Sequence, residues 1–159
     1  MTRVGFGFDL HPLVAGRPLV LGGVTVDSEV GLGGHSDADV LSHAVAEALL
    51  GALALGDLGR HFPDTDPRWR GISSLLLLGQ VIELVRGRGG ALVNVDATVL
   101  AQAPRLAPHL PEMAKRLADV LGIQVERVSV KAKSPEGLGL VGRREGIAAM
   151  AVVSIEVRE

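Results

Sequence analysis

Apolar and polar positions near the start of the chain indicate β-structure. Arg3–Leu10 is short and strand-like, and Leu19–Leu21 and Val24–Val26 form a predicted hairpin that turns at Gly22-Gly23. Asp27–His35 shows no such pattern and is interpreted as a long loop. The N-terminal part of the chain is therefore expected to contain strands and no helix.

A helix is predicted after this loop, starting at Ala38. Ser36, followed by Asp39 three residues later, is typical of a helix N-terminal cap. The apolar residues that follow recur at intervals of three and four, which places them on one helical face. They are Leu41, Ala44, Val45, Ala48, Leu49 and Ala52.

The rest of the chain alternates between helices, strands and loops. Glycine, proline and aspartate mark Gly56–Gly71 as a loop. Glycines follow both further helices and mark where they end. The predicted helices are Ser73–Val85 and Glu112–Leu121, the predicted strands are Ala91–Leu100, Val128–Ala132 and Ile147–Val157, and Pro135–Gly146 is a glycine-rich connection.

Strands mixed with helices predict an α/β protein, in the form of an α+β sandwich with a mixed sheet and helices on one face. A length of 159 residues favours one domain over residues 1–159. Ile147–Val153 is apolar at almost every position, so both faces of this strand need cover. Helices on one face leave the other face bare, and we therefore expect a homo-oligomer whose sheets pack together.

Composition and charge exclude several classes of function. The chain has no cysteine, so a metal site must rest on histidine and carboxylate groups. The net charge of −2 gives no overall field that attracts nucleic acid or an anionic membrane, and neither is an expected partner. Met1–Pro12 lacks the apolar region of a signal peptide, and Ala44–Leu55 is shorter than the about 20 residues that span a bilayer. We expect a cytoplasmic protein.

Asp9 and His11 are the sharpest chemical feature of the sequence. Side chains two apart on a strand share a face, so this carboxylate and imidazole can converge. His43, in the predicted helix, could add a ligand from a second element. Three nitrogen and oxygen ligands with an open fourth position are the pattern of a catalytic zinc. In the alternative interpretation, His11 only caps a loop.

His35 and Ser36 lie at the N-terminus of the same predicted helix. A helix N-terminus offers unpaired N–H groups and a partial positive charge, which favour a phosphate group. His35 could then act on charge that develops on the phosphate. In the alternative interpretation, Ser36 and Asp39 only cap the helix.

Loop residues supply weaker signals, and each segment could also be solvated surface. Carboxylates of Asp57–Gly59 and Phe62–Pro67 could accept hydrogen bonds from a sugar, and Ala101–Leu106 could contact a base. Gly137–Gly142 matches G-x-G-x-x-G but leads into a strand, so no dinucleotide site is predicted. Polar groups around it could bind phosphate or, through Glu136, magnesium.

A series of motifs runs in order along nearly the whole chain: GFDLH (7–11), LGGV (21–24), GHSDADVLSHA (34–44), LGDLG (55–59), FPDTDP (62–67), NVDAT (94–98), AQAPR (101–105) and GLVGRREGI (139–147). In this order they resemble the 2-C-methyl-D-erythritol 2,4-cyclodiphosphate synthases, lyases of the non-mevalonate isoprenoid pathway. This family converts 4-diphosphocytidyl-2-C-methyl-D-erythritol 2-phosphate to the cyclic diphosphate and releases CMP.

The resemblance implies a metal-dependent homotrimer with active sites between subunits. It implies one zinc per chain at Asp9, His11 and His43, and a magnesium or manganese ion on Glu136 and the substrate diphosphate. It places the catalytic residues His35 and Ser134 near the transition state, and Arg143 and Glu145 at a cavity on the three-fold axis. The substrate contacts that it implies are Asp9, Leu10, His11, His35, Ser36, Asp57, Leu58, Gly59, Phe62, Pro63, Asp64, Thr65, Asp66, Ala101, Gln102, Ala103, Pro104, Arg105, Leu106, Ala107, Lys133, Ser134, Pro135, Glu136, Leu140 and Arg143.

The chain departs from the family pattern at a few positions. Phe6 stands where histidine is common, Gly34 where alanine is common, and Leu140 where phenylalanine is common. Lys133 replaces a threonine, while the hydroxyl of Ser134 is kept. The implied zinc ligands are unaffected.

Two other functions remain open at this point. A zinc-dependent phosphohydrolase would use the same three ligands with a bound water as the nucleophile. A non-catalytic trimeric binding protein would use the metal only for structure.

Overall fold

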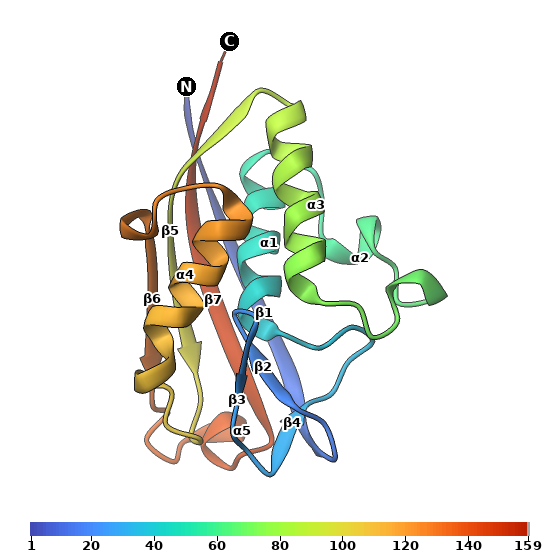
Figure 1. Ribbon diagram of the computed structural model, residues 1–159, viewed down its shortest axis with the longest axis vertical. Helices are drawn as coiled ribbons and strands as arrows, with labels where there is room; N and C mark the ends of the chain where they lie inside the picture. The colour runs from blue at the N-terminus through green and yellow to red at the C-terminus, as the bar shows by residue number, and fades with distance from the viewer. Residues whose placement is uncertain (159) are drawn as a thin grey trace.

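A five-stranded mixed sheet is one layer of the computed structural model, which describes residues 1–158 (Figure 1). Its strands lie in the order β4-β1-β7-β5-β6; β5 and β6 run parallel, and the other neighbours are antiparallel. The bounds are β1 (Thr2–Ala15), β4 (Val30–Leu32), β5 (Gly90–Leu100), β6 (Val128–Lys133) and β7 (Gly146–Val157). The predicted hairpin of β2 (Leu19–Leu21) and β3 (Val24–Val26) forms separately.

Helices cover one face of this sheet and leave the other bare (Figure 1). The long helices are α1 (Val40–Ala52), α3 (Ser74–Gly87) and α4 (Leu110–Leu121). The short ones are α2 (Leu58–His61) and α5 (Gly139–Gly142), with 3₁₀ turns η1 (Pro67–Trp69), η2 (Ala107–His109) and η3 (Val125–Arg127). The bare face exposes Val4, Phe6, Phe8, Leu10 and Val152. The predicted sandwich with helices on one face is confirmed.

β1 continues past the predicted end at Leu10, and β4 lies in the segment that was expected to be a loop. Pairing of β1 with β7 ends at Pro12, whereas Leu13–Ala15 pairs with Val30–Leu32. Pro12 has no N–H to donate, which is typical of a strand end or edge. The extension therefore depends on pairing with a distant segment, which local sequence does not show.

α1 begins later than predicted, and Asp39 caps it in place of Ser36. Ala38 has a φ of 57°, which is not helical, and the Asp39 carboxylate accepts the Ser42 N–H at 3.0 Å. The same buried carboxylate accepts the N–H groups of Gly22 and Gly23 at 2.9 and 2.7 Å. Asp39 thus ties the β2–β3 hairpin to the start of α1.

Glycines in β1 let α1 pack directly on the strand backbone. A Cβ added to Gly5 would lie 1.8 Å from the Ala48 carbonyl oxygen. Gly7 stands in the same relation to Ala44 one turn earlier, at 1.9 Å. No other residue type allows this approach, because only glycine lacks the Cβ. The packing brings the first turns of α1 against the part of β1 that carries Asp9.

The remaining differences are small. α2 and η1 lie within the predicted loop Gly56–Gly71. α4 starts at Leu110, so Pro111 lies in its first turn, where proline is tolerated. Within residues 1–158, no helix combines the length and the apolar character needed to cross a membrane.

Candidate active site

A cavity of about 590 Å³ opens where β1 meets α1 and the loops on either side of α2. Its walls combine ionisable side chains, apolar side chains and glycine backbone. They consist of Asp9, His11, Pro12, Gly33, Gly34, His35, Ser36, His43, Glu47, Leu58, Gly59, Phe62, Pro63, Asp64, Trp69 and Leu77. The cavity thus collects predicted site residues from separate parts of the chain.

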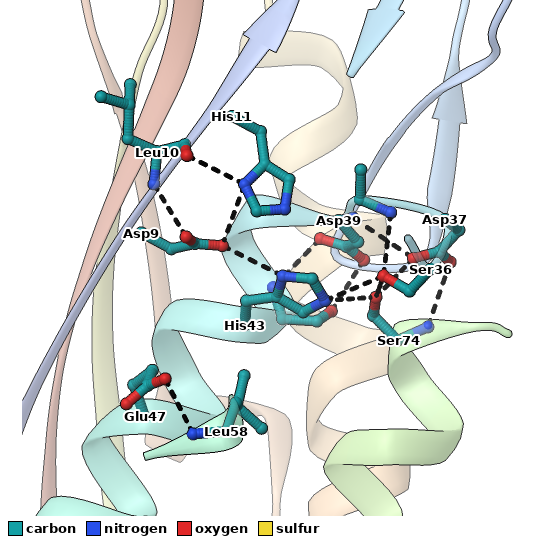
Figure 2. A network of polar contacts seen from close by, with 12 residues as sticks. Asp9, Leu10, His11, Ser36, Asp37, Asp39, His43, Glu47, Leu58 and Ser74 are labelled. Atoms are coloured by element: carbon teal, nitrogen blue, oxygen red, sulfur yellow. Dashed lines mark hydrogen bonds and ion pairs between the residues drawn. The ribbon is translucent and has the colours of Figure 1, made fainter. Parts of the chain in front are cut away.

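Asp9, His11 and His43 form a cluster on the cavity wall (Figure 2). Asp9 and His11 project from the same face of β1, as predicted, and His43 faces them from α1. The Asp9 Oδ2 lies 3.4 Å from His11 Nδ1 and 3.0 Å from His43 Nδ1. One ligand atom from each residue lies within 4.8 Å of the others. The cluster could therefore hold a metal ion.

Hydrogen bonding leaves one ring nitrogen of His11 free. Its Nδ1 lies 2.9 Å from the Leu10 carbonyl oxygen, which only accepts, so Nδ1 carries the proton. Nε2 keeps its lone pair and lies 3.2 Å from the place that a Cβ on Gly34 would occupy. The glycine at position 34, a departure from the family pattern, leaves room beside this nitrogen.

His43 is held from both sides. Its Nδ1 faces Asp9, and its Nε2 lies 2.8 Å from the Ser74 Oγ and 3.2 Å from the Ser36 Oγ. Burial lowers the pKa of His43, but the hydrogen bond with Asp9 and the charge of that carboxylate outweigh burial, so the pKa is raised above its ordinary value. The imidazolium form of His43 is thus favoured beside Asp9.

Glu47 is a cavity residue that sequence reasoning missed. It lies one turn after His43, and these two are the side chains of α1 that are only partly buried. Its Oε1 accepts the Leu58 N–H at 3.0 Å, which ties α2 to α1 (Figure 2). Burial raises the pKa of Glu47, and the charges of Asp57 and Asp9 add to this, while the hydrogen bond from Leu58 opposes it. Its spacing of four from His43 was the signal that could have revealed it.

His35 and Ser36 line the cavity, but the start of α1 is not a free phosphate site. The Asp39 carboxylate already occupies that helix end, which disfavours a second anion there. Asp39 is thus the cap of α1, and His35 and Ser36 line the cavity beside that helix end. His35 Nε2 lies 3.2 Å from the Asp66 carbonyl oxygen, and its own carbonyl accepts the Gly71 N–H at 2.8 Å. His35 is thus anchored to the segment Asp57–Pro67, called the acidic loop below.

The acidic loop contributes only part of its predicted residues to the cavity. Those that line it are Leu58, Gly59, Phe62, Pro63 and Asp64. Asp57 instead caps α2 by accepting the Arg60 N–H at 2.9 Å, and Asp66 pairs with Arg68 at 2.6 Å. Thr65 is exposed. Leu10, a predicted substrate contact on β1, projects to the bare face of the sheet, because successive side chains of a strand point to opposite faces.

The other predicted substrate segments lie outside this cavity. Ala101–Ala107 follows β5 and Lys133–Glu136 starts at the last residue of β6, and neither lines the cavity. The Gln102 side-chain oxygen accepts the Gly137 N–H at 2.9 Å, which joins the two segments. Among residues 1–158, Glu136 is not part of a cluster of potential metal ligands.

The G-x-G-x-x-G segment ends in the four-residue α5 and then enters β7. As predicted, this segment is not followed by a long helix, so it lacks the dinucleotide-binding geometry. Leu140 within it and Lys133 before it are exposed. Arg143 donates to Glu145 at 2.6 Å on the surface.

Comparison with known sequences decides the family. Residues 2–156 match the sequence profile of the YgbB family. The chain belongs to the YgbB family. A relative from Desulfitobacterium hafniense (strain DSM 10664 / DCB-2), named 2-C-methyl-D-erythritol 2,4-cyclodiphosphate synthase, is 57% identical over 155 residues, 98% of each chain. A relative of the same name from Syntrophobacter fumaroxidans is 60% identical over 151 residues, 95% of each chain. The predicted family, a lyase of isoprenoid biosynthesis, is confirmed.

Solved structures extend this likeness to the fold. A 2C-methyl-D-erythritol-2,4-cyclodiphosphate synthase with CDP bound is 39% identical, with a TM-score of 0.89 over 97% of this YgbB-family chain and 100% of that one. The Plasmodium falciparum IspF in complex with CDP is 30% identical, with a TM-score of 0.87 over 99% of this chain and 97% of that one. The bifunctional IspDF of Campylobacter jejuni is 40% identical, with a TM-score of 0.96, and this chain spans all of its own length but 43% of that protein.

Proposed function

We propose that this chain converts 4-diphosphocytidyl-2-C-methyl-D-erythritol 2-phosphate to 2-C-methyl-D-erythritol 2,4-cyclodiphosphate and CMP. The observation that carries the proposal is the cluster of Asp9, His11 and His43 beside His35 in one cavity, in a chain of this family. An oxygen of the 2-phosphate forms a bond to the β-phosphorus. The bond from that phosphorus to the bridging oxygen breaks, and CMP leaves with the electron pair. Because the attacking group belongs to the substrate, no protein nucleophile is needed.

A divalent cation fits the cluster by its donor chemistry. One carboxylate and two imidazoles match the three-ligand sites of catalytic zinc, and the chain has no cysteine that would favour a sulfur site. We assign one zinc per chain to Asp9, His11 and His43. When bound, such a cation draws charge from phosphate oxygens.

The protein itself has to fold the substrate back on itself and keep water out. Ser36 offers a hydroxyl to the cavity and His35 an imidazole, both suited to a phosphate. The loop Asp64–Asp66, anchored through His35, would lie over the methylerythritol group. Phe62 and Leu77 supply apolar wall that limits access of water. We expect the sugar phosphate to bind here.

The cytidine half of the substrate needs residues from outside this cavity. The family resemblance assigns it to Asp57, Gly59 and the backbone of Ala101–Leu106, with Ser134 at the reacting phosphate and magnesium or manganese at Glu136. Two solved relatives are described with CDP bound. Because Ala101–Ala107 and Lys133–Glu136 do not line the cavity of their own chain, we infer that they serve the cavity of a neighbouring subunit.

A homotrimer would supply that neighbour. The bare sheet face carries large exposed apolar side chains, among them Phe6 and Phe8. An apolar patch on a sheet face is what a subunit interface buries. The patch lies on the same sheet as the ends of β5 and β6, from which the nucleotide segments continue. Sheet-to-sheet packing would therefore also bring those segments near another subunit.

The test is to incubate the protein with the diphosphocytidyl substrate, zinc and magnesium, and to follow the products by phosphorus NMR. The expected products are the cyclic diphosphate and CMP, and Asp9→Asn should lose most of the turnover. Linear phosphates would support the phosphohydrolase instead. Metal binding without any turnover would support the non-catalytic binding protein.

A further inference from the structure

Ser74 and Asp37 stand on the side of His43 that faces away from Asp9 (Figure 2). Ser74 is the first residue of α3 and is 1% exposed. Ser73, at the N-cap position, makes no side-chain cap bond. Instead Asp37, from the loop before α1, accepts the Ser74 N–H at 3.1 Å and also contacts the Ser74 hydroxyl. A residue from another element thus caps α3 and sets a carboxylate against Ser74.

The carboxylate decides the direction of the hydrogen bonds around Ser74. An ionised carboxylate only accepts, and a serine hydroxyl has one proton, so Ser74 donates to Asp37 Oδ1. The Ser74 oxygen is then left to accept, and His43 Nε2 lies 2.8 Å from it. It follows that His43 Nε2 carries a proton and donates to Ser74.

The hydrogen bond from His43 Nε2 to Ser74 also determines the role of the other ring nitrogen, Nδ1. Without a cation, Nδ1 also carries a proton, which it donates to the Asp9 carboxylate. A cation would take the place of that proton, and the imidazole is then neutral, with its proton on Nε2 and its lone pair on Nδ1. Nδ1 is the atom 3.0 Å from Asp9 Oδ2, on the cluster side. His11 is arranged in the opposite sense, with its Nδ1 proton on the Leu10 carbonyl and its Nε2 free. Each histidine therefore has one ring nitrogen occupied by a protein acceptor and one available to a cation.

Ser36 is the competing partner of His43 Nε2, at 3.2 Å. Its oxygen accepts the Ala38 N–H at 3.1 Å and lies 3.4 Å from the Ser74 Oγ, and within residues 1–158 no carboxylate accepts its proton. A proton donated from Ser36 to Nε2 would reverse the assignment. The shorter distance to Ser74, and the anchoring of Ser74 by Asp37, favour the direction given above.

We propose that Asp37 and Ser74 are positioning residues that hold His43 in its Nε2-protonated form and so direct Nδ1 to the cation. Hydrogen-bond partners of metal ligands typically change metal affinity by about 10- to 100-fold when they are removed. The inference rests on the proposed function only in that the cluster binds a divalent cation.

The test measures zinc affinity by competition with a chelator, without substrate. Ser74→Ala should bind zinc about 10- to 100-fold more weakly than the wild-type chain. Asp37→Asn should weaken binding in the same direction, because its amide can donate to Ser74 and free the Ser74 proton for Nε2. Ser42→Ala is the matched control: this buried serine precedes His43 on α1, and its hydroxyl bonds Asp39 at 2.7 Å. It should leave zinc affinity unchanged.

Nitrogen-15 NMR of the histidine rings gives a second readout that a merely structural role would not move. The zinc-loaded wild-type chain should show a slowly exchanging proton on His43 Nε2 and the metal on Nδ1, and Ser74→Ala should lose the slow exchange. The inference is overturned if Ser74→Ala and Asp37→Asn bind zinc as tightly as Ser42→Ala, or if the metal is on Nε2. Neither measurement depends on turnover. If both give the expected result but the chain forms no cyclic diphosphate, the proposed function is wrong and the positioning role of Asp37 and Ser74 stands.

Discussion

Gly7 lies so close to Ala44 that strand and helix meet through their backbones: a Cβ on Gly7 would stand 1.9 Å from the Ala44 carbonyl oxygen. Asp9 follows two residues after Gly7 on the same face of β1, and His43 precedes Ala44 on α1. The contact therefore sets the distance between two ligands of the candidate metal site. The packing of α1 on β1 therefore determines the geometry of the cluster.

Gly7→Ala should destabilise the fold strongly. The added methyl group meets backbone atoms, which cannot rotate away as a side chain can, so α1 must move. We expect a loss of about 3 kcal/mol or more in the free energy of unfolding, at or above the upper end of the usual cost of overpacking. Denaturant unfolding followed by circular dichroism measures it.

Gly51→Ala is the control for this substitution on the same helix. Its Cβ would have only ordinary contact, 3.7 Å from the Phe6 carbonyl oxygen. Alanine is the better helix former, so stability should be kept or should rise by up to about 1 kcal/mol. Equal losses in the two variants would show that the close approach at Gly7 does not matter.

Periodicity along the chain was enough to predict most of the fold, and it failed where distant segments pair. α1 and α3 follow from apolar spacing, but β4 and the end of β1 form only because Leu13–Ala15 meets Val30–Leu32. The three residues of β4 are too few to show an alternating pattern.

The candidate site was predictable in the same uneven way. Asp9 and His11 are two apart on a strand, which is a local signal. Asp37 and Ser74 are far apart in the sequence and come together only when α3 packs against α1. No spacing along the chain records that contact, and the role of the serine depends on the direction of a hydrogen bond that exists only in the folded state.

A divalent cation should stabilise the chain through the cluster. With free zinc at about 100 times its dissociation constant, linkage adds about 2.7 kcal/mol to the free energy of unfolding. Asp9→Asn should lose most of this gain because it removes the charged ligand, and a chelator should reverse the gain in the wild-type chain. Thermal unfolding with and without zinc measures it.

Asp64→Asn is the matched control for the zinc response. Asp64 lines the same cavity but is not part of the cluster. This variant should keep the full response to zinc. If Asp9→Asn and Asp64→Asn respond alike, the cation does not bind at Asp9.

Glu47→Gln should change the pH dependence of stability. Burial raises the pKa of Glu47 in the folded chain, so the ionised form costs stability. That cost is fully present above the folded pKa and disappears as the pH falls below the unfolded value of about 4.3. Glutamine keeps an acceptor for the Leu58 N–H without the charge. In metal-free protein it should raise stability at pH 7 by less than about 1 kcal/mol, and the gain should vanish near pH 4.

Glu126→Gln, at an exposed glutamate of η3, is the control for the pH series. It should stay within about 0.5 kcal/mol of the wild-type chain throughout. Denaturant unfolding between pH 3.5 and 8 compares the three proteins. A stability gain from Glu47→Gln that grows toward low pH would contradict the raised pKa.

Phe8→Asp should break the proposed trimer. Phe8 is 53% exposed on the bare sheet face, and a charge there would be buried without a partner if three sheets packed together. The wild-type chain should have three times the chain mass by light scattering, and the variant the mass of one chain. Turnover should fall with the mass, because Ala101–Ala107 would no longer reach a neighbouring cavity.

Leu76→Asp separates the interface from a general effect of adding a charge. Leu76 is 61% exposed on α3, so it is at least as accessible as Phe8 but lies on the helical side of the chain. This variant should keep both the trimer mass and the turnover. A Phe8→Asp chain that is monomeric and fully active would show that each cavity works alone, and the nucleotide segments would then need another role.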